Sequence, residues 1–157
     1  MSDPSAKRPI FLWWVGAITF VALVLGGVSH TYPPLPPELT LEIKFPSGNP
    51  APRTEPLISS GTFGNADFVV VNYLDRTSAT FSYDFWGFGG PTSERFTFKP
   101  GERYTLRIAM PAFAASGVAP AAKTAPLRIE LDGHKLLDTN VPFHRRAADQ
   151  IFFSENP

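Results

Sequence analysis

The chain has 157 residues, which is enough for one domain with a short appendage. Its 17 prolines and 12 glycines exclude a bundle of long soluble helices. Its 14 basic residues balance 14 acidic ones, so no global field attracts nucleic acid, and the lack of cysteine excludes disulfides, thiolate metal sites and cysteine catalysis.

The first element is an apolar segment near the N-terminus. Ile10–Val28 contains nineteen residues without a charge, which is long enough to span the hydrocarbon layer of a bilayer as a helix. We therefore predict a transmembrane helix at residues 10–29 after a cytoplasmic tail at residues 1–9. The second interpretation is a cleaved signal peptide, because Gly27-Val28-Ser29 offers small residues at a cleavage site.

The flanks of this segment set its orientation. Lys7 and Arg8 precede it, and the first charge after it is Glu38, so the positive-inside rule predicts a single-pass protein of the inner membrane with its C-terminal part in the periplasm. The predicted membrane-interface residues are these two cations with Trp13, Trp14 and Tyr32.

Two short patterns add detail to this region. Ala22 and Gly26 form a small-xxx-small pair that would let another helix approach closely, although many apolar segments contain such a pair by chance. Residues 30–38 form a predicted spacer, in which Thr31–Glu38 holds four prolines in eight residues and so favours an extended, stiff conformation. The spacer separates the span from a domain at residues 39–157.

Apolar and polar residues alternate with a period of two through most of this domain, which predicts half-buried strands. Asp67–Leu74 is more continuously apolar, with Phe68, Val69, Val70 and Val71 in a row, which predicts a strand in the middle of a sheet. Asp132-Gly133 between two such runs predicts a type I′ hairpin. The expected strands are Leu39–Phe45, Asp67–Leu74, Ala79–Phe85, Tyr104–Met110, Leu127–Leu131, His134–Leu137 and Ile151–Phe153.

We expect roughly eight to ten strands in an all-β antiparallel sandwich of jelly-roll-like type. Between Met110 and Leu127 the small residues and prolines predict a long surface loop, with a short helix near Phe113–Ser116 as the alternative. Together with the membrane segment, the fold class is one N-terminal transmembrane helix followed by a β-sandwich.

Three segments carry a resemblance to a known family. The runs ADFVVVNYLDRTSATFSYDFWGFGG, ERYTLRIAM and LRIELDGHKLLD, within Ala66–Asp138, resemble the concanavalin A-like or laminin-G-like jelly roll. The Pro-rich N-terminal third departs from that family's pattern. Members commonly bind glycans or proteins, some of them through calcium, so the resemblance implies binding.

The candidate binding residues are aromatic and lie at the end of one expected strand. Tyr83, Phe85, Trp86 and Phe88 are followed or separated by glycines, which let the backbone turn sharply while the aromatic rings supply contact energy. One interpretation is a loop that binds a partner or a glycan. The other is a plug that folds back over the open end of the sandwich. Trp86 lies opposite the inward register of Phe85 and is the stronger functional candidate.

Catalytic and metal-binding patterns are weak. The three histidines His30, His134 and His144 form no spaced cluster, no nucleophile elbow occurs, and Glu130 with Asp132 is interpreted as a solvated face. We therefore expect no enzyme, no cofactor and no metal site. A calcium site is the alternative, and it would need four scattered carboxylates to converge: Asp67, Asp75, Asp84 and Asp132.

The leading functional hypothesis is a non-enzymatic, membrane-anchored accessory subunit of a larger membrane protein complex, by analogy one of respiratory or photosynthetic type. Its expected partners are the other subunits and the lipid bilayer, and it should bind no nucleic acid. The alternative is a membrane-tethered carbohydrate-binding module that uses the aromatic loop. The basic run Phe143–Arg146 is interpreted as ordinary solvated surface, with anionic headgroups or an acidic partner as its alternative ligands.

Overall fold

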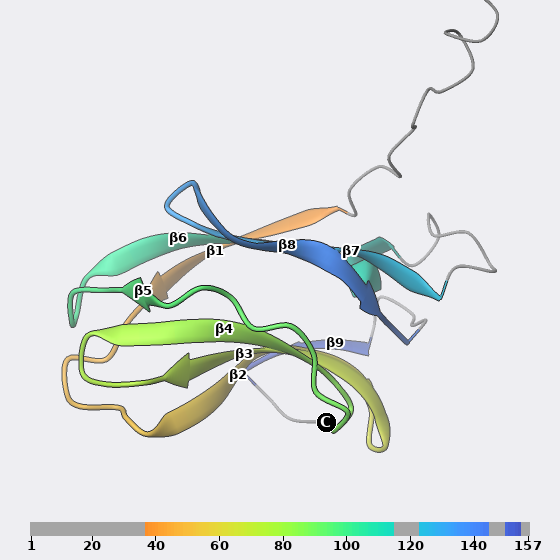
Figure 1. Ribbon diagram of the computed structural model, residues 1–157, viewed down its shortest axis with the longest axis horizontal. Coiled ribbons are helices and arrows are strands. Elements are labelled where there is room, and N and C mark those ends of the chain that lie inside the picture. The colour runs from red at the N-terminus through yellow and green to blue at the C-terminus, as the bar shows by residue number, and fades with distance from the viewer. Residues whose placement is uncertain (1–36, 115–122, 145–149, 155–157) are drawn as a thin grey trace, which may run out of the picture. The chain divides into compact units, whose positions relative to one another are not determined.

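The computed structural model describes residues 37–114, 123–144 and 150–154, all of which belong to the unit Pro34–Pro157. In these segments there are nine strands and one short 3-10 helix (Figure 1). The elements are β1 (Glu38–Lys44), β2 (Arg53–Thr62), β3 (Asn65–Tyr73), β4 (Ser78–Phe85), β5 (Phe96–Thr97), β6 (Arg103–Ala109), η1 (Pro111–Ala114), β7 (Thr124–Leu131), β8 (His134–Pro142) and β9 (Ile151–Phe153).

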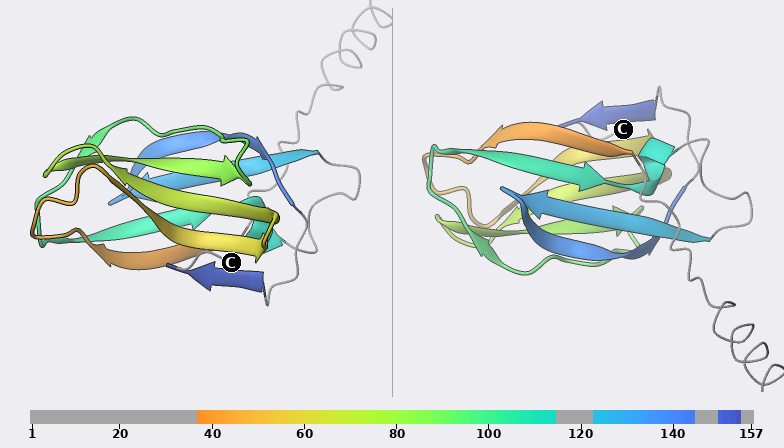
Figure 2. Two further views of the ribbon diagram at one scale, coloured as in Figure 1. Left: turned by 90° about the horizontal axis from the view of Figure 1, so that it is seen from below. Right: turned by 90° about the horizontal axis from the view of Figure 1, so that it is seen from above.

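The strands form two antiparallel sheets packed as a sandwich, which confirms the all-β prediction. One sheet has the order β1-β6-β7-β8 and the other the order β5-β4-β3-β2-β9. Figure 2 shows the five-stranded sheet from one side and the four-stranded sheet from the other. β1 pairs with β6 and β9 pairs with β2, so each of these two strands joins a sheet whose other members are distant in sequence.

β3 lies at the centre of the five-stranded sheet, as its continuous apolar run predicts. Val69, Val71 and Tyr73 face the other sheet and are buried in the common core. Phe68 points to the opposite side and is also buried, at 9 % exposure. Both faces of β3 are therefore covered along part of its length.

The core lies between the two sheets. β4 contributes Phe81 and Tyr83, and the four-stranded sheet contributes the alternate apolar residues of β6 and β7. The fully buried aliphatic side chains from the four-stranded sheet are Leu106, Ile108, Leu127, Ile129 and Val141. In these strands the apolar residues of the period-two pattern face the core, and the polar residues between them face outward.

The turn between β7 and β8 has the predicted type I′ geometry. Asp132 and Gly133 have φ values of 48° and 79°, both in the left-handed region that this turn requires. The Asp132 carboxylate also accepts a hydrogen bond from the backbone N–H of Thr105 at 2.7 Å. The side chain therefore ties the hairpin to the neighbouring strand β6.

Two strands were not predicted. β2 contains Pro56 followed by a register shift, and then the buried polar residues Ser59 and Ser60, so its sequence lacks an alternating pattern. β5 has two residues and carries almost no pattern. In the expected loop after Met110, Pro111–Ala114 forms η1 and residues 115–122 lie outside the described segments.

The features predicted for the N-terminal region fall almost entirely outside the described residues. Among the described residues, no helix is long and apolar enough to cross a membrane. The predicted tail, transmembrane helix and most of the spacer lie outside those residues, as do Lys7, Arg8, Trp13, Trp14, Ala22, Gly26 and Tyr32.

Antiparallel pairing defines two ends of the sandwich. At one end, β1 begins, β4 ends, and the turn that joins β2 to β3 is located; we call this the proximal end. Both sheets meet there, because His144, just after β8, bonds to Asp67 of β3. The distal end carries the β3–β4 turn, which begins at Leu74, and the β7–β8 hairpin.

Candidate functional site

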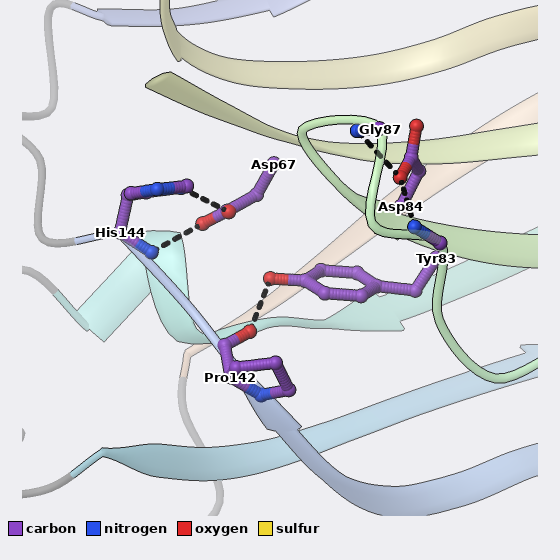
Figure 3. Close-up of polar contacts among 7 residues, drawn as sticks. Asp67, Tyr83, Asp84, Gly87, Pro142 and His144 are labelled. Carbon is purple, nitrogen blue, oxygen red and sulfur yellow. Dashed lines mark hydrogen bonds and ion pairs between the residues drawn. The ribbon is translucent and has the colours of Figure 1, made fainter. Parts of the chain in front are cut away.

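A polar cluster joins the two sheets at the proximal end. The Asp67 side chain is fully buried, and its Oδ2 accepts a hydrogen bond from the backbone N–H of His144 at 2.9 Å. The Nδ1 of the His144 ring lies 2.8 Å from Oδ1 of Asp67. The Tyr83 hydroxyl donates to the carbonyl of Pro142 at 2.8 Å (Figure 3). These contacts fasten the end of β8 to β3 and β4.

Burial dominates the electrostatics of this cluster. Desolvation raises the pKa of Asp67, while its hydrogen bonds and charge interaction with His144 act in the opposite direction. Desolvation, together with the negative charge of Asp67, also raises the pKa of Tyr83. Both oxygens of Asp67 are held by one histidine, so this pair acts as a structural link between the sheets.

The loop after β4 is built around Asp84. Its Oδ1 accepts hydrogen bonds from the backbone N–H groups of Gly87 at 3.0 Å and Gly89 at 2.9 Å (Figure 3). Gly87 and Gly89 have φ values of 76° and 72°, which glycine adopts without strain, whereas Trp86 has a φ of 30°, which residues with a side chain rarely adopt. The glycines of the sequence therefore serve a tight, internally bonded loop.

Aromatic side chains gather around this loop, and we call Phe63, Phe68, Phe85, Trp86 and Phe88 the proximal aromatic cluster. The half-buried Trp86 lies 5.8 Å from Phe68 and 5.3 Å from Phe63, measured between ring centroids. Phe85 is 6.0 Å from Phe88 in the same measure. Phe63 and Phe88 are each 85 % exposed, so the outer members of the cluster project into solvent.

The four predicted binding residues thus have different environments. Tyr83 is buried at 1 % exposure and belongs to the core. Phe85 is half-buried and stacks on the His144 ring at 4.2 Å with an interplanar angle of 7°. Trp86 covers Phe68 on the outer face of the five-stranded sheet, and Phe88 is the exposed member. Phe85 and Trp86 therefore cover the end of the sandwich, as the plug interpretation predicts, and Phe88 projects into solvent, as the binding-loop interpretation predicts.

Phe63 was not identified from the sequence. It is an isolated aromatic residue next to Gly64 in the turn between β2 and β3, and β2 itself was not predicted. Only the pairing of β3 with β4 brings it within contact distance of Trp86. The pairing of Asp67 with His144 was missed for the same reason, because 77 residues separate them.

The carboxylates considered for calcium are used locally. Asp75 accepts hydrogen bonds from Thr77 and Ser78 and pairs with Arg95. Asp132 binds the backbone of β6, and the other two belong to the contacts described above. In the described segments, no group of three or more His, Asp or Glu side chains is placed to hold a metal ion.

A shallow groove of about 310 Å³ lies beside the start of β1. Residues of β1, η1 and β9 form its walls: Pro37, Glu38, Leu39, Phe113, Ile151 and Phe153. Its lining is mostly apolar, and Phe153 is half exposed. The groove is at the open side of the sandwich, where the edge strands of the two sheets face each other.

Comparisons with protein-family models, curated proteins and solved structures find no match for this chain. The resemblance to concanavalin A-like domains therefore stays a prediction. The fold and the proximal aromatic cluster are the basis for a functional proposal.

Proposed function

We propose that this protein is a non-enzymatic accessory subunit of a larger membrane protein complex. In this proposal residues 10–29 anchor the chain in the inner membrane, Lys7 and Arg8 keep its N-terminus in the cytoplasm, and the jelly-roll-like sandwich lies in the periplasm. The chain docks on the complex through its helix, where Ala22 and Gly26 permit close packing, and through the sandwich.

One observation carries this proposal: the two most exposed aromatic side chains of the described residues lie at the end of the sandwich where β1 begins. The predicted spacer enters the domain at Glu38, at the same proximal end as Phe63 and Phe88. A short, proline-rich tether at this end would hold these rings toward the membrane and its embedded proteins. The exposed rings and the predicted membrane helix would then bind the same complex.

The buried polar cluster supports a non-catalytic role. Asp67 and His144 form the one carboxylate–histidine hydrogen bond among the described residues, and the Asp67 side chain has no exposed surface. A general base must be able to reach a proton on its substrate. Here both carboxylate oxygens already bind His144, whose ring is covered by Phe85.

The second candidate is a membrane-tethered carbohydrate-binding module. It is favoured by the T-shaped contact of Trp86 with the exposed Phe63, which forms an aromatic ridge on the outer face of the five-stranded sheet. Aromatic rings of this kind stack on sugars. The location at the proximal end favours the first proposal, because a glycan would have to reach the ridge from the side of the domain's own membrane.

Purification in a mild detergent tests the proposed function. The full chain, tagged at its C-terminus and extracted from its native membrane, should migrate on a native gel in a complex much larger than 17.2 kDa. A lone monomer would contradict the proposal. Retention on a glycan array that is lost in Trp86→Ala, in a variant that stays folded, would instead support the carbohydrate-binding module.

A further inference from the structure

We propose that the proximal aromatic cluster inserts its exposed rings into the lipid-water interface of the membrane that anchors the chain. The inference rests on the anchoring part of the proposed function. It names the surface that the proximal end contacts, which is lipid, with Phe63 and Phe88 as the inserted side chains.

The first argument is the shape of the two turns that carry these rings. Phe63 occupies the turn between β2 and β3, and Phe88 occupies the loop that follows β4. The two strands next to these turns, β3 and β4, pair along their length, so the turns are neighbours at one end of the sheet. Each ring is 85 % exposed, and the half-buried Trp86 lies between Phe63 and the sheet. Tryptophan is favoured at the membrane interface, and phenylalanine is common on the apolar face of helices that lie in the interface.

The second argument is that the loop after β4 satisfies its own backbone donors. Trp86 N–H donates to the carbonyl of Ala66 at 3.0 Å, and Phe88 N–H donates to the carbonyl of Phe85 at 3.0 Å. The N–H groups of Gly87 and Gly89 donate to Asp84. Four successive N–H groups are thus bonded within the protein. Because unbonded polar groups are costly away from water, this loop can enter the interface at little expense.

The third argument is the distribution of charge between the two ends. The proximal turns, Thr62–Asn65 and Trp86–Gly90, contain no acidic or basic residue. The distal turns contain several, in Leu74–Thr77 and in Asp132–Lys135. The end with these two uncharged turns also carries the two most exposed phenylalanines of the described residues, whereas the charges at that end lie on strands, as in the Arg107–Glu38 ion pair. Contact with lipid is expected at an end with this composition and not at the other.

The point where the predicted spacer joins the domain completes the argument. β1 begins at Glu38, at the same proximal end as the β2–β3 turn and the end of β4. An anchor at residues 10–29, as proposed above, would therefore be joined to the sandwich at the end that carries Phe63 and Phe88.

Spin labels on the full chain test the inference directly. The protein has no cysteine, so single substitutions Phe63→Cys, Phe88→Cys and Leu74→Cys each accept one nitroxide. Leu74 is the matched control, because it is an exposed hydrophobic residue, at 47 %, at the distal end. The chain is reconstituted without partners into phosphatidylcholine vesicles with one quarter phosphatidylglycerol. We expect labels at residues 63 and 88 to collide more with oxygen than with a water-soluble nickel chelate, and the label at residue 74 to show the reverse.

The possible failures of the two proposals are distinguishable. If the vesicles float and retain the chain at alkaline pH, but the labels at residues 63 and 88 are as accessible to nickel as the label at residue 74, lipid insertion is overturned alone. If the chain does not float with the vesicles, the anchor and the inference fail together. A benzophenone amino acid at residue 63 or 88 that cross-links efficiently to a protein in native membranes would show that a subunit, and not lipid, covers the cluster.

A second measurement uses Trp86 without altering the cluster. Trp13 and Trp14 are the other two tryptophans, so the variant Trp13→Phe/Trp14→Phe leaves Trp86 as the sole reporter. Replacing the lipids with brominated ones should quench its fluorescence, and adding a soluble quencher should have little effect. Unchanged emission in brominated lipids would overturn the inference.

Discussion

The loop after β4 depends on the missing side chain of Gly90. A Cβ atom at this position would lie 2.5 Å from the carbonyl oxygen of Tyr83 and 3.1 Å from its Cδ1. Contacts below 3.0 Å do not occur for real Cβ atoms, so the loop or β4 would have to move by about half an ångström. The substitution Gly90→Ala therefore tests whether the loop packs against β4 as described.

The neighbouring backbone has little freedom to move. Tyr83 N–H donates to the carbonyl of Pro91 at 3.0 Å, and Tyr83 is paired with Val69 on its other side. Overpacking of a well-packed site costs about 1–3 kcal/mol, and a backbone carbonyl favours the upper half of this range. For a domain of roughly 120 residues, about 2–3 kcal/mol corresponds to a fall in Tm of about 6–15 °C.

Thermal unfolding of the full chain in mild detergent, followed by circular dichroism of the sheets, measures this change. Gly48→Ala is the matched control, because a methyl group added at Gly48 would have no neighbouring atom within 4 Å. Its effect should stay within about 0.5 kcal/mol. Equal Tm values for the two variants would refute the packing of the loop on Tyr83.

Three further predictions concern the core and its charges. Ile58→Ala in β2 should lower the unfolding free energy by about 2–5 kcal/mol in urea denaturation, because the side chain is fully buried, whereas Leu74→Ala should cost less than about 1 kcal/mol. Asp67 has a pKa above its ordinary 3.8. The unfolding free energy of the wild type minus that of Asp67→Asn should therefore be largest below pH 3.8 and fall as the pH rises through the raised pKa. A difference that grows with pH would contradict this. Asp138 has a pKa below its ordinary 3.8, chiefly because of a hydrogen bond to Lys135. The unfolding free energy of the wild type should therefore exceed that of Asp138→Asn above pH 3.8, and this excess should decline in more acidic solution. An excess that does not change with pH would count against the ion pair.

The sequence predicted those strands in which alternation and burial agree. β1, β4 and β6 each alternate along the inner face of a sheet, and their observed bounds differ from the predicted ones by one residue at each end or less. β7 begins three residues earlier than predicted and β8 extends to Pro142. The extensions contain Pro126 and polar residues of β8, which break the pattern although they are paired with a neighbouring strand.

β2 shows why some of the strands could not be predicted from the sequence. Its Ser59 and Ser60 are buried because β3 and β9 flank them on either side, and β9 lies about 90 residues further along the chain. The burial of a serine in a strand depends on this packing and not on the strand preference of the residue itself. The exposure of Phe63 depends on the same strand, since the turn exists only where β2 meets β3.

The sequence by itself determined which residues of the alternating strands face inward, where the Asp132-Gly133 hairpin forms, and that an uncharged segment precedes a proline-rich spacer, because these properties depend on neighbours within a few residues. Only the tertiary structure decided that Phe63 lies against Trp86, that Phe88 lies against Phe85 at the same end, and that Asp67 binds His144. It also placed that cluster at the end where β1 begins. Such contacts arise from antiparallel pairing between strands distant in the chain, and a local pattern carries no information about which ends those pairings bring together.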